Sequence, residues 1–468
     1  MFKAGIALSL ALAGCATAPA YRAPEVQVPT AFRETRDTVI ETLGTGPAAP
    51  DTLVWPDLGD STLTRLLKDA VGANLDVRAA EARVRGARAA RTEAVLDLAP
   101  TVTFAGGYTR QRLSSASFPG FGTFPDQDIW DAGFDAFWEL DLFGRVRRNV
   151  QAQGAFVAVT QEDQRDLQIS LSAELARAYF ELRGAQEQLS VAQRNGDNQR
   201  RSLEVTRQRL DAGRGTAFDT ERAQAQLSLT LASIPVLESR VRQAQYQIGV
   251  LVGRPPAALA AELEPVAPLP ALPPAVSVAS PDSVVRRRPD VAAAERQLAV
   301  ERALVGAAKA DYLPRITVGG SAGYSAASFD ALGDGGTFRY AVGPIISWPL
   351  LNLGRVKARV DLSRAREAEA RAQYDQTVLL ALQDVETSLV RYRTSRARVE
   401  RIQDAAAASE RAAELARARF SGGVSDFLQV LDAERTQLEA QDQLAQGRTE
   451  AATAYAALYK ALGGALPS

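Results

Sequence analysis

The chain contains the stretch WELDLFGRV at residues 138–146, and 210 residues later it contains WPLLNLGRV at 348–356. This recurrence indicates a duplicated architecture, because two further segments recur in the same order. They are DLAPTVTF at 97–104 with DYLPRITV at 311–318, and RLDAG at 209–213 with RFSGG at 419–423. A repeat of this length indicates two copies of one structural unit related by pseudo-symmetry, rather than a solenoid of short modules.

A strand is predicted around the first quoted stretch, because apolar and polar residues alternate through 130–142, with Phe137 as the one exception. Residues 101–109 form its predicted partner, and the second copy repeats the pair at 316–324 and 338–350. The strands are long, carry aromatic residues near their ends, and are joined by loops rich in Gly, Ser, Pro and Phe. These features favour strands of an outer-membrane barrel over the alternative, a half-buried sheet in a soluble domain.

The strand count has a consequence for assembly. Four strands are too few for a closed outer-membrane barrel, which starts at about eight. An open sheet edge in lipid leaves backbone groups unpaired, at a cost of several kcal/mol each. We therefore expect the chain to oligomerise. A trimer with twelve strands fits, whereas a dimer with eight would leave little lumen.

Helices are predicted on both sides of the strands. Residues 61–98 have strong helix composition, with Ser61 or Asp60 as the N-cap. From Arg145 to about Leu210 the pattern predicts a helix of roughly 100 Å. Heptad-like apolar positions in both copies predict seam packing of long helices, and the duplication argues against a free two-stranded coiled coil. The seam positions are Leu171, Leu175, Ala178 and Leu182, and Val378, Leu382, Val385, Leu389 and Tyr392.

A glycine-containing turn follows each long helix, and a returning helix is predicted after it. Glycine supplies the positive φ that such a turn needs. Thr216 and Ser425 are the expected N-caps of the returning helices. Each copy is therefore expected to fold as helix, strand pair, long helix, tight turn and returning helix.

The N-terminus has the features of a bacterial lipoprotein signal. A basic start, a short apolar run and small residues before Cys15 predict a signal peptide at 1–14 and lipidation of Cys15. The alternative is an ordinary signal peptide with an incidental cysteine. Ala16 after the cysteine favours an outer-membrane address, and residues 15–60 are expected to be the lipid anchor and an extended strap.

Several classes of function are disfavoured by composition. The chain has no histidine and one cysteine, which removes the usual catalytic triads and histidine metal sites. Lys and Arg number 54 against 55 Asp and Glu, so no bulk charge attracts nucleic acid. No glycine-rich phosphate loop is present. We therefore expect no enzymatic activity, no metal, no cofactor and no nucleic-acid partner.

Longer motifs resemble those of a known family. Residues 283–298 (SVVRRRPDVAAAERQL), followed by DYLP at 311–314, closely resemble the signature of TolC-like outer-membrane efflux proteins, in their NodT-type lipoprotein branch. Residues 343–355 and 419–435 resemble the family's last strand and helix-tip motif. One departure is Leu351-Asn352, where the family often has Phe-Asp.

The resemblance implies a mainly α fold with transmembrane β structure, in which a homotrimer forms a twelve-stranded barrel and an α-helical periplasmic tunnel. The expected segments are 61–256 for the first repeat, 257–282 for a Pro-rich linker and 283–468 for the second repeat. The implied partners are a periplasmic adaptor protein, an inner-membrane transporter of the resistance-nodulation-division type and outer-membrane lipid.

The resemblance also implies where a gate would lie. Leu428 becomes a candidate apolar ring, and Asp432 and Arg435 become candidate constriction partners between protomers. The alternative for the last two is an ordinary i, i+3 pair on a solvated helix face. Candidate adaptor contacts are the tip residues Gly213, Arg214, Gly215, Gly423, Val424 and Ser425.

Carboxylates on the polar face of the predicted strand are candidate lumen residues. Three copies of them would make a negative mouth that favours cationic solutes, although simple wetting of the lumen is the preferred interpretation. They are Asp131, Asp135, Glu139 and Asp141.

The leading functional hypothesis is an exit duct for small molecules in a tripartite efflux system. One alternative is the outer-membrane duct of a type I protein secretion system. Another is a structural lipoprotein scaffold without a pore.

Overall fold

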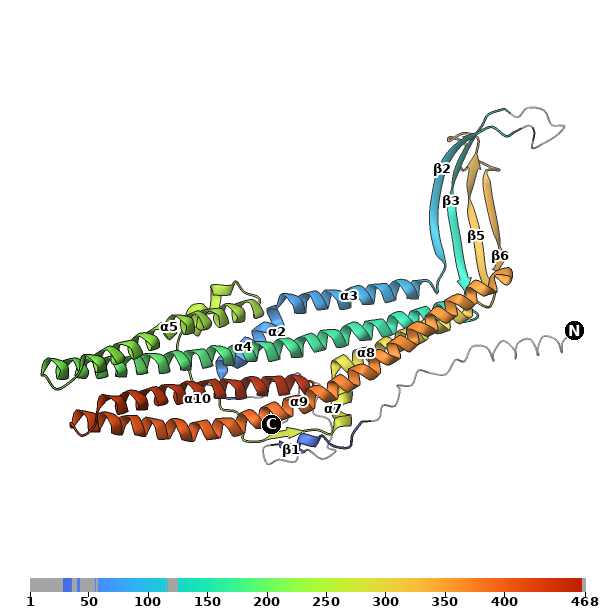
Figure 1. Cartoon of the computed structure of the whole chain (residues 1–468). Helices are drawn as coiled ribbons and strands as arrows, with labels where there is room; N and C mark the ends of the chain where they lie inside the picture. Colours follow the sequence, from blue (N-terminus) through green and yellow to red (C-terminus); the bar gives the residue numbers. More distant parts are fainter. Residues whose placement is uncertain are drawn as a thin grey trace. The chain divides into compact units, whose positions relative to one another are not determined.

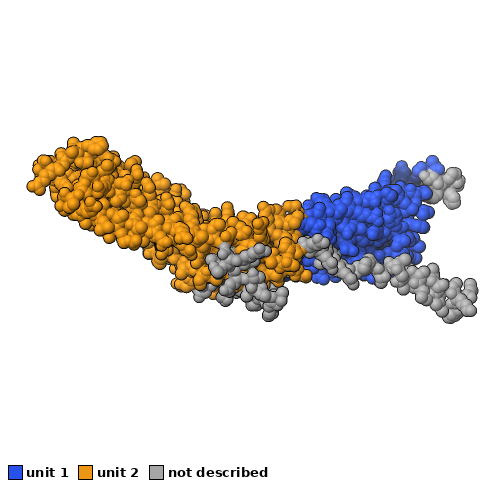
Figure 2. All heavy atoms as spheres, turned by 60° about the horizontal axis from the view of Figure 1, so that its bottom comes forward, with its two compact units in different colours: residues 1–25, 83–161, 293–375 blue, residues 26–82, 162–292, 376–468 orange. Residues whose placement is uncertain are grey.

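The computed structural model describes residues 28–35, 40–42, 55, 58–114, 116 and 125–464, and the predicted signal peptide and Cys15 lie outside them. The chain divides into two compact units (Figure 2). Among the described residues, the first unit comprises Arg83–Gln161 and Ala293–Asp375, and the second comprises the remainder. Each unit therefore contains segments from both sequence copies.

The first unit contains a four-stranded sheet in which all neighbouring strands are antiparallel (Figure 1). In spatial order its strands are β2 (Thr101–Gln111), β3 (Gln127–Leu140), β5 (Arg315–Ala326) and β6 (Phe338–Ser347). The four predicted strands are confirmed. Two of them end earlier than expected, since β3 stops before Asp141 and β6 stops before Trp348.

The sheet has one polar and one apolar face. The register places Asp135 between Thr103 and Ser321 on one face. The neighbouring positions put Phe134 beside Phe104 on the other face, with ring centroids 5.4 Å apart. The period-2 pattern in the sequence therefore predicted the two faces correctly.

Trp138 and Trp348, which are equivalent residues of the two copies, make the same kind of hydrogen bond. Trp138 donates its Nε1–H to the Leu98 carbonyl at 2.9 Å. Trp348 donates to the Tyr312 carbonyl at 3.1 Å. Trp138 lies near the end of β3 and Trp348 directly follows β6, and each bond reaches the turn that precedes the partner strand.

The long helices form two hairpins, α4 (Arg145–Asp211) with α5 (Ala217–Leu251) and α9 (Leu353–Ser421) with α10 (Phe427–Ala461) (Figure 1). The prediction of a helix to about residue 210 is confirmed. Apart from Leu382, which is partly buried, the predicted seam residues are buried. They are Leu171, Leu175, Ala178, Leu182, Val378, Val385, Leu389 and Tyr392.

Shorter helices precede each strand pair. They are α2 (Ser61–Ala73) and α3 (Leu75–Leu96) in the first copy, and α7 (Pro281–Arg287) and α8 (Pro289–Ala310) in the second. The single helix predicted over 61–98 is therefore wrong. Asn74 interrupts it because its side-chain oxygen accepts from the backbone N–H groups of Asp76 and Val77, as a cap does. Asp60, one of the two expected caps, caps α2 by accepting from the Leu63 N–H.

The residue at each helix break also holds the returning helix. Asn74 donates to the Leu251 carbonyl at 2.9 Å, and the buried Arg288 donates to the Ala461 carbonyl at 2.9 Å. Both carbonyls belong to the last residue of a returning helix. The two copies therefore join the same helices with different side chains.

Buried tyrosines on the long helices form the centre of the second unit. The Tyr179 hydroxyl donates at 2.7 Å to the carboxylate that caps α2, and Arg183 donates to that hydroxyl at 3.1 Å. Burial, followed by the bond to the carboxylate, raises the pKa of Tyr179 to about 12. In the second copy, Tyr392 and Arg396 both donate to the Pro273 carbonyl.

The linker between the copies is partly ordered. A small parallel pair joins β4 (Val276–Val278) of the linker to β1 (Ile40–Thr42) of the strap. The sequence pattern did not predict this pair. The remaining short elements are η1 (Arg33–Thr35), η3 (Pro256–Leu259), α6 (Ala260–Leu263) and η4 (Leu350–Asn352). In the part of the chain that the structure describes, no helix has a stretch long and apolar enough to cross a membrane.

Candidate functional site

The two hairpin turns have the same backbone geometry. Gly213 and Gly423 have φ values of 67° and 76°. In the first turn, the Arg214 N–H donates to the Arg209 carbonyl at 2.8 Å, and Val424 makes the equivalent bond at 2.9 Å. This is the pattern of a helix end with a left-handed glycine, so the conformational role predicted for both glycines is confirmed.

One of the two predicted N-caps of the returning helices is confirmed and the other is wrong. Thr216 caps α5 by accepting from the Asp219 N–H. Ser425 does not cap α10. The cap is Asp426, which accepts from the Gln429 N–H at 3.2 Å, because α10 begins one residue later than expected.

An apolar cluster lies just behind the turns and was not predicted. The rings of Phe420 and Phe427 lie 5.5 Å apart within it. The Arg209 guanidinium stacks 4.0 Å above the Phe420 ring and donates to the Phe420 carbonyl, which joins the end of α4 to the end of α9. The other buried members are Leu203, Ala223, Leu227, Val430 and Leu431.

The candidate gate residues lie on the first three turns of α10. Leu428 is 49% exposed. It follows Phe427 and lies two residues before Val430, and both of these are buried in the apolar cluster. Asp432 and Arg435 are exposed and form an i, i+3 ion pair of 3.5 Å, and Arg435 also lies 3.7 Å from Glu439. Within one chain, the simple helix pair is therefore present, and a contact between protomers stays a prediction.

A row of buried polar side chains joins α4 to α10 above the tips. Asn195 donates to Gln441 at 3.0 Å, and Ser202 donates to Glu434 at 2.7 Å. Between these two pairs lie Gln199 and Gln437, which are 3% and 4% exposed. Both amide atoms of Gln199 and the side-chain oxygen of Gln437 have no hydrogen-bond partner among the described residues. The six side chains of this polar row are Asn195, Gln199, Ser202, Glu434, Gln437 and Gln441.

The candidate lumen carboxylates are mostly paired. Asp131 lies 3.2 Å from Arg339, and Glu139 accepts from Arg145 at 2.6 and 2.9 Å. Asp141 was expected on the strand but lies beyond it. There its carboxylate accepts from the N–H groups of Val146 and Arg147, at 3.0 and 2.8 Å, in the first turn of α4. Pairing with arginine weakens the case for a strongly negative mouth.

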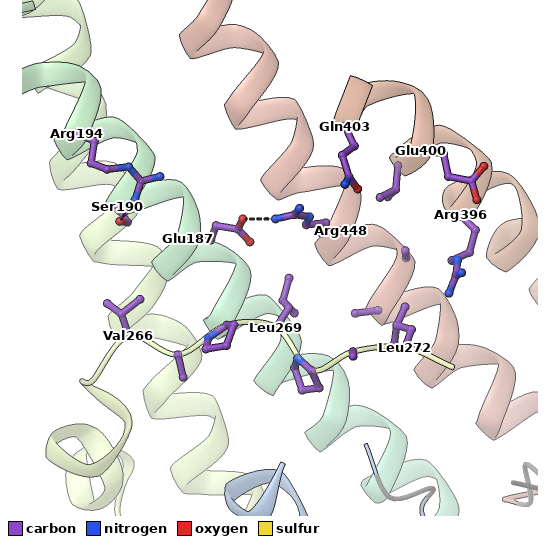
Figure 3. A pocket seen from close by; sticks show the side chains of 17 residues that line it. Glu187, Ser190, Arg194, Val266, Leu269, Leu272, Arg396, Glu400, Gln403 and Arg448 are labelled. Atoms are coloured by element: carbon purple, nitrogen blue, oxygen red, sulfur yellow. Dashed lines mark hydrogen bonds and ion pairs between the residues drawn. The ribbon is translucent and has the colours of Figure 1, made fainter. Parts of the chain in front are cut away.

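A groove of about 590 Å³ lies between the linker and helices α4, α9 and α10 (Figure 3). Leu269 and Leu272 of the linker supply apolar walls, and Arg448 donates across the groove to Glu187 at 2.9 Å. None of the predicted site residues lines this groove. Within the described ranges, no three Asp, Glu, His or Cys side chains gather as metal ligands would.

Comparison with known proteins agrees with this architecture. The sequence profile of the family described as "Outer membrane efflux protein" matches residues 66–254 and 281–464. Outer membrane protein OprJ of Pseudomonas aeruginosa is 31% identical over 461 residues, covering 98% of this chain and 94% of OprJ. Nodulation protein T of Rhizobium leguminosarum bv. trifolii is 27% identical, covering 97% and 95%. The toluene efflux pump outer membrane protein TtgF of Pseudomonas putida is 29% identical, covering 98% and 96%.

Solved structures match over the same length. The outer-membrane channel OprN has a TM-score of 0.88 at 36% identity, covering 96% of this chain and 99% of OprN. The open state of the MtrE outer membrane channel of Neisseria gonorrhoeae has a TM-score of 0.81 at 27% identity, covering 96% and 98%. Since the family profile matches both copies and OprN covers nearly the whole fold, the chain belongs to the outer membrane efflux protein family.

Proposed function

We propose that three copies of this chain form the exit duct of a tripartite efflux system. In this assembly the four-stranded sheets close into a twelve-stranded barrel, and the hairpins line a periplasmic tunnel. The chain is the outer-membrane component, and it carries small molecules without a catalytic step.

The sheet supplies the observation that carries the proposal. Among the described residues, its outer strands β2 and β6 each have a neighbouring strand on one side only. Its apolar face is exposed in the single chain, with Phe104 at 66%, Phe134 at 57% and Tyr340 at 74%. An exposed aromatic face is costly in water, and unpaired strand edges are costly in lipid. Both costs are removed when the edges pair with further copies and the aromatic face contacts a lipid bilayer.

Small molecules are the favoured cargo. The related TtgF is named for toluene efflux and OpmQ of Pseudomonas aeruginosa for pyoverdine export. Both names describe small compounds rather than secreted proteins. A periplasmic adaptor and an inner-membrane transporter of the resistance-nodulation-division type are the proposed partners, because relatives such as TtgF are named as the outer membrane protein of an efflux pump.

The tip residues have two proposed roles. The exposed turns, which contain Gly213, Arg214 and Gly215 in the first copy and Gly423, Val424 and Ser425 in the second, are the proposed adaptor contacts. Leu428, Asp432 and Arg435 lie within the next turns of helix and are the proposed gate. Their exposure in the single chain leaves them available for contacts between protomers.

The N-terminal segment is proposed to anchor the duct through a lipid on Cys15. Residues Ile40–Thr42 of the proposed strap form the β1–β4 pair with the linker. The proposed repeat boundaries stay at 61–256 and 283–468, although α7 begins at Pro281, two residues inside the proposed linker.

The test is accumulation of a fluorescent dye in cells that lack the gene. Deletion should raise the dye content, and restoring the gene should lower it again. If accumulation is unchanged while export of a secreted protein fails, the type I secretion alternative replaces this proposal. The trimer is tested separately, by the mass of the detergent-purified protein. A monomeric mass would refute the twelve-stranded barrel.

A further inference from the structure

A basic pocket of about 260 Å³ lies in the first unit, where β5 begins, β6 ends and α9 starts. Its walls bring together three guanidinium groups and one carboxylate. Arginine stays protonated in proteins, so these four side chains carry a net positive charge. They are Asp311, Arg315, Arg355 and Arg359.

The carboxylate neutralises only part of this charge. Asp311 lies 2.6 Å from Arg315 and 3.6 Å from Arg359, and its side chain is only 14% exposed. The Arg355 side chain forms no ion pair or hydrogen bond with any described residue, although it lines the same pocket. The Arg355 guanidinium is therefore free to bind a ligand, whereas Arg315 and Arg359 share the Asp311 carboxylate.

The first copy of the repeat supplies an internal comparison. Its counterpart of Arg355 is Arg145, which is paired with Glu139 at 2.6 and 2.9 Å. The second copy has Pro349 at the position of that glutamate, so the partner is missing. Two further positions change from neutral to basic between the copies, namely Thr101 to Arg315 and Asn149 to Arg359. The positive pocket is therefore a property of the second copy and not of the shared fold.

We propose that Arg315, Arg355 and Arg359 bind an anion that carries a phosphate or carboxylate group. The fork of an arginine matches both groups in a two-bond geometry. Ser347 and Asn352 also line the pocket and supply neutral hydrogen-bond donors. Asp311 keeps Arg315 and Arg359 in place, and Arg355 is the group that completes the site.

The position of the pocket favours a dissolved anion over a lipid headgroup. Arg315 lies on the same face of β5 as Thr317 and Ser321, which is the polar face of the sheet. The proposal that a passing solute supplies the anion rests on the proposed duct, because the polar face of the sheet would line its lumen. Binding of an anion to the purified protein does not depend on it.

The decisive variant is the double substitution Arg355→Gln with Arg359→Gln. It leaves Asp311 paired with Arg315, so the local fold keeps its closer ion pair. The matched control is Arg366→Gln on the same helix, which removes an exposed arginine that has no ion pair among the described residues. Inorganic phosphate is the probe, compared with chloride at equal ionic strength, and the readout is the concentration that produces the half-maximal rise in Tm.

Phosphate should raise the Tm of the wild type and of Arg366→Gln alike. The double variant should need at least ~10-fold more phosphate, which corresponds to about 1.4 kcal/mol. Replacing both arginines by lysine should give an intermediate value, because the charge remains but the fork is lost. The proposal fails if the wild type shows no phosphate-specific rise, or if the double variant responds like the wild type.

A second arm separates the two sources. Protein recovered from phosphatidylcholine vesicles that contain phosphatidylglycerol is extracted and its lipids are measured. Retention of phosphatidylglycerol by the wild type alone would identify a headgroup and overturn the choice of a dissolved anion. Loss of efflux of an anionic dye, with efflux of a cationic dye kept, in cells carrying the double variant would support the solute. A deletion strain without any efflux defect would refute the duct but leave the phosphate result standing.

Discussion

Replacing Arg288 by methionine removes four hydrogen bonds from the junction between α7 and α8. The guanidinium donates twice to Asp290, at 2.7 and 3.0 Å, once to Asp384 at 3.2 Å and once to the Ala461 carbonyl at 2.9 Å. The Arg288 side chain is only 9% exposed. Methionine fills a similar volume, so the change mainly tests the polar contacts.

The magnitude follows from the exposure of each partner. The bond to Ala461 is buried and contributes about 1.5 kcal/mol. The two-bond pair with Asp290, which is 31% exposed, adds about 1 kcal/mol, and the contact with Asp384, which is 58% exposed, adds up to about 0.5 kcal/mol. The expected loss is therefore about 3 kcal/mol, which would raise the equilibrium constant for local opening roughly 100-fold.

Hydrogen exchange of the amides in the last turn of α10 measures this loss directly, because Ala461 lies there. The matched control is Arg286→Met in the same short helix. Arg286 is 78% exposed and pairs with Asp282 four residues before it, so its loss should change exchange by less than about twofold. Equal exchange in the two variants would refute the claim that Arg288 holds α10.

Four further outcomes are expected. Replacing Gln199 and Gln437 by leucine should stabilise the protein by about 1–3 kcal/mol, measured by urea unfolding, because both amide atoms of Gln199 and the side-chain oxygen of Gln437 are buried without partners among the described residues. Asp426→Ala should cost about 1 kcal/mol through loss of the α10 cap, seen as faster exchange at the start of that helix. Asp432→Ala should raise the conductance of the reconstituted channel if the proposed gate acts between protomers. The Tm should fall as the pH rises above about 10, because burial raises the pKa of Tyr459 to about 12.

The controls separate these effects from general damage. Ser425→Ala should leave exchange at the start of α10 unchanged, since Ser425 does not cap it. Glu439→Ala removes the other exposed partner of Arg435, and an equal rise in conductance would contradict a specific role for Asp432. For the tyrosine, the sign follows from the raised pKa. The stabilisation is fully present below about 10, the unfolded pKa, and is lost as the pH rises through about 12. A Tyr459→Phe variant with an undiminished fall would contradict this cause.

The order of helices, strands and turns could be predicted from the sequence, because each pattern in the first copy occurs again in the second. The helix expected to about residue 210 ends at Asp211, and both turn glycines have positive φ. The wrong predictions concern helix ends, where a local side-chain hydrogen bond determines the residue at which the helix stops or starts. Asn74 ends one helix and caps the next, although composition favours a continuous helix. Asp426 takes the place of Ser425 because periodicity does not fix a helix start to one residue.

The candidate sites were less predictable, for two physical reasons. A gate or adaptor contact at Asp432 depends on a second chain, and a single sequence does not encode that contact locally. The basic pocket depends on Asp311 and Arg355, which are far apart along the chain. A signal for it was nevertheless present in the sequence. Aligning the two copies shows Pro349 where the first copy has Glu139, so the second copy lacks a partner carboxylate at this position.

Fusion of the two copies into one chain also sets how often a mutation appears in the assembly. Six separate single-repeat chains would present every substitution six times around a ring. In the proposed trimer each substitution appears three times. Side chains can therefore differ between equivalent positions of the two copies, although the backbone is repeated. Asn74 and Arg288 already differ in this way while bonding equivalent carbonyls. The duplicated chain can therefore change the charge of one half of a ring and leave the other half as it was.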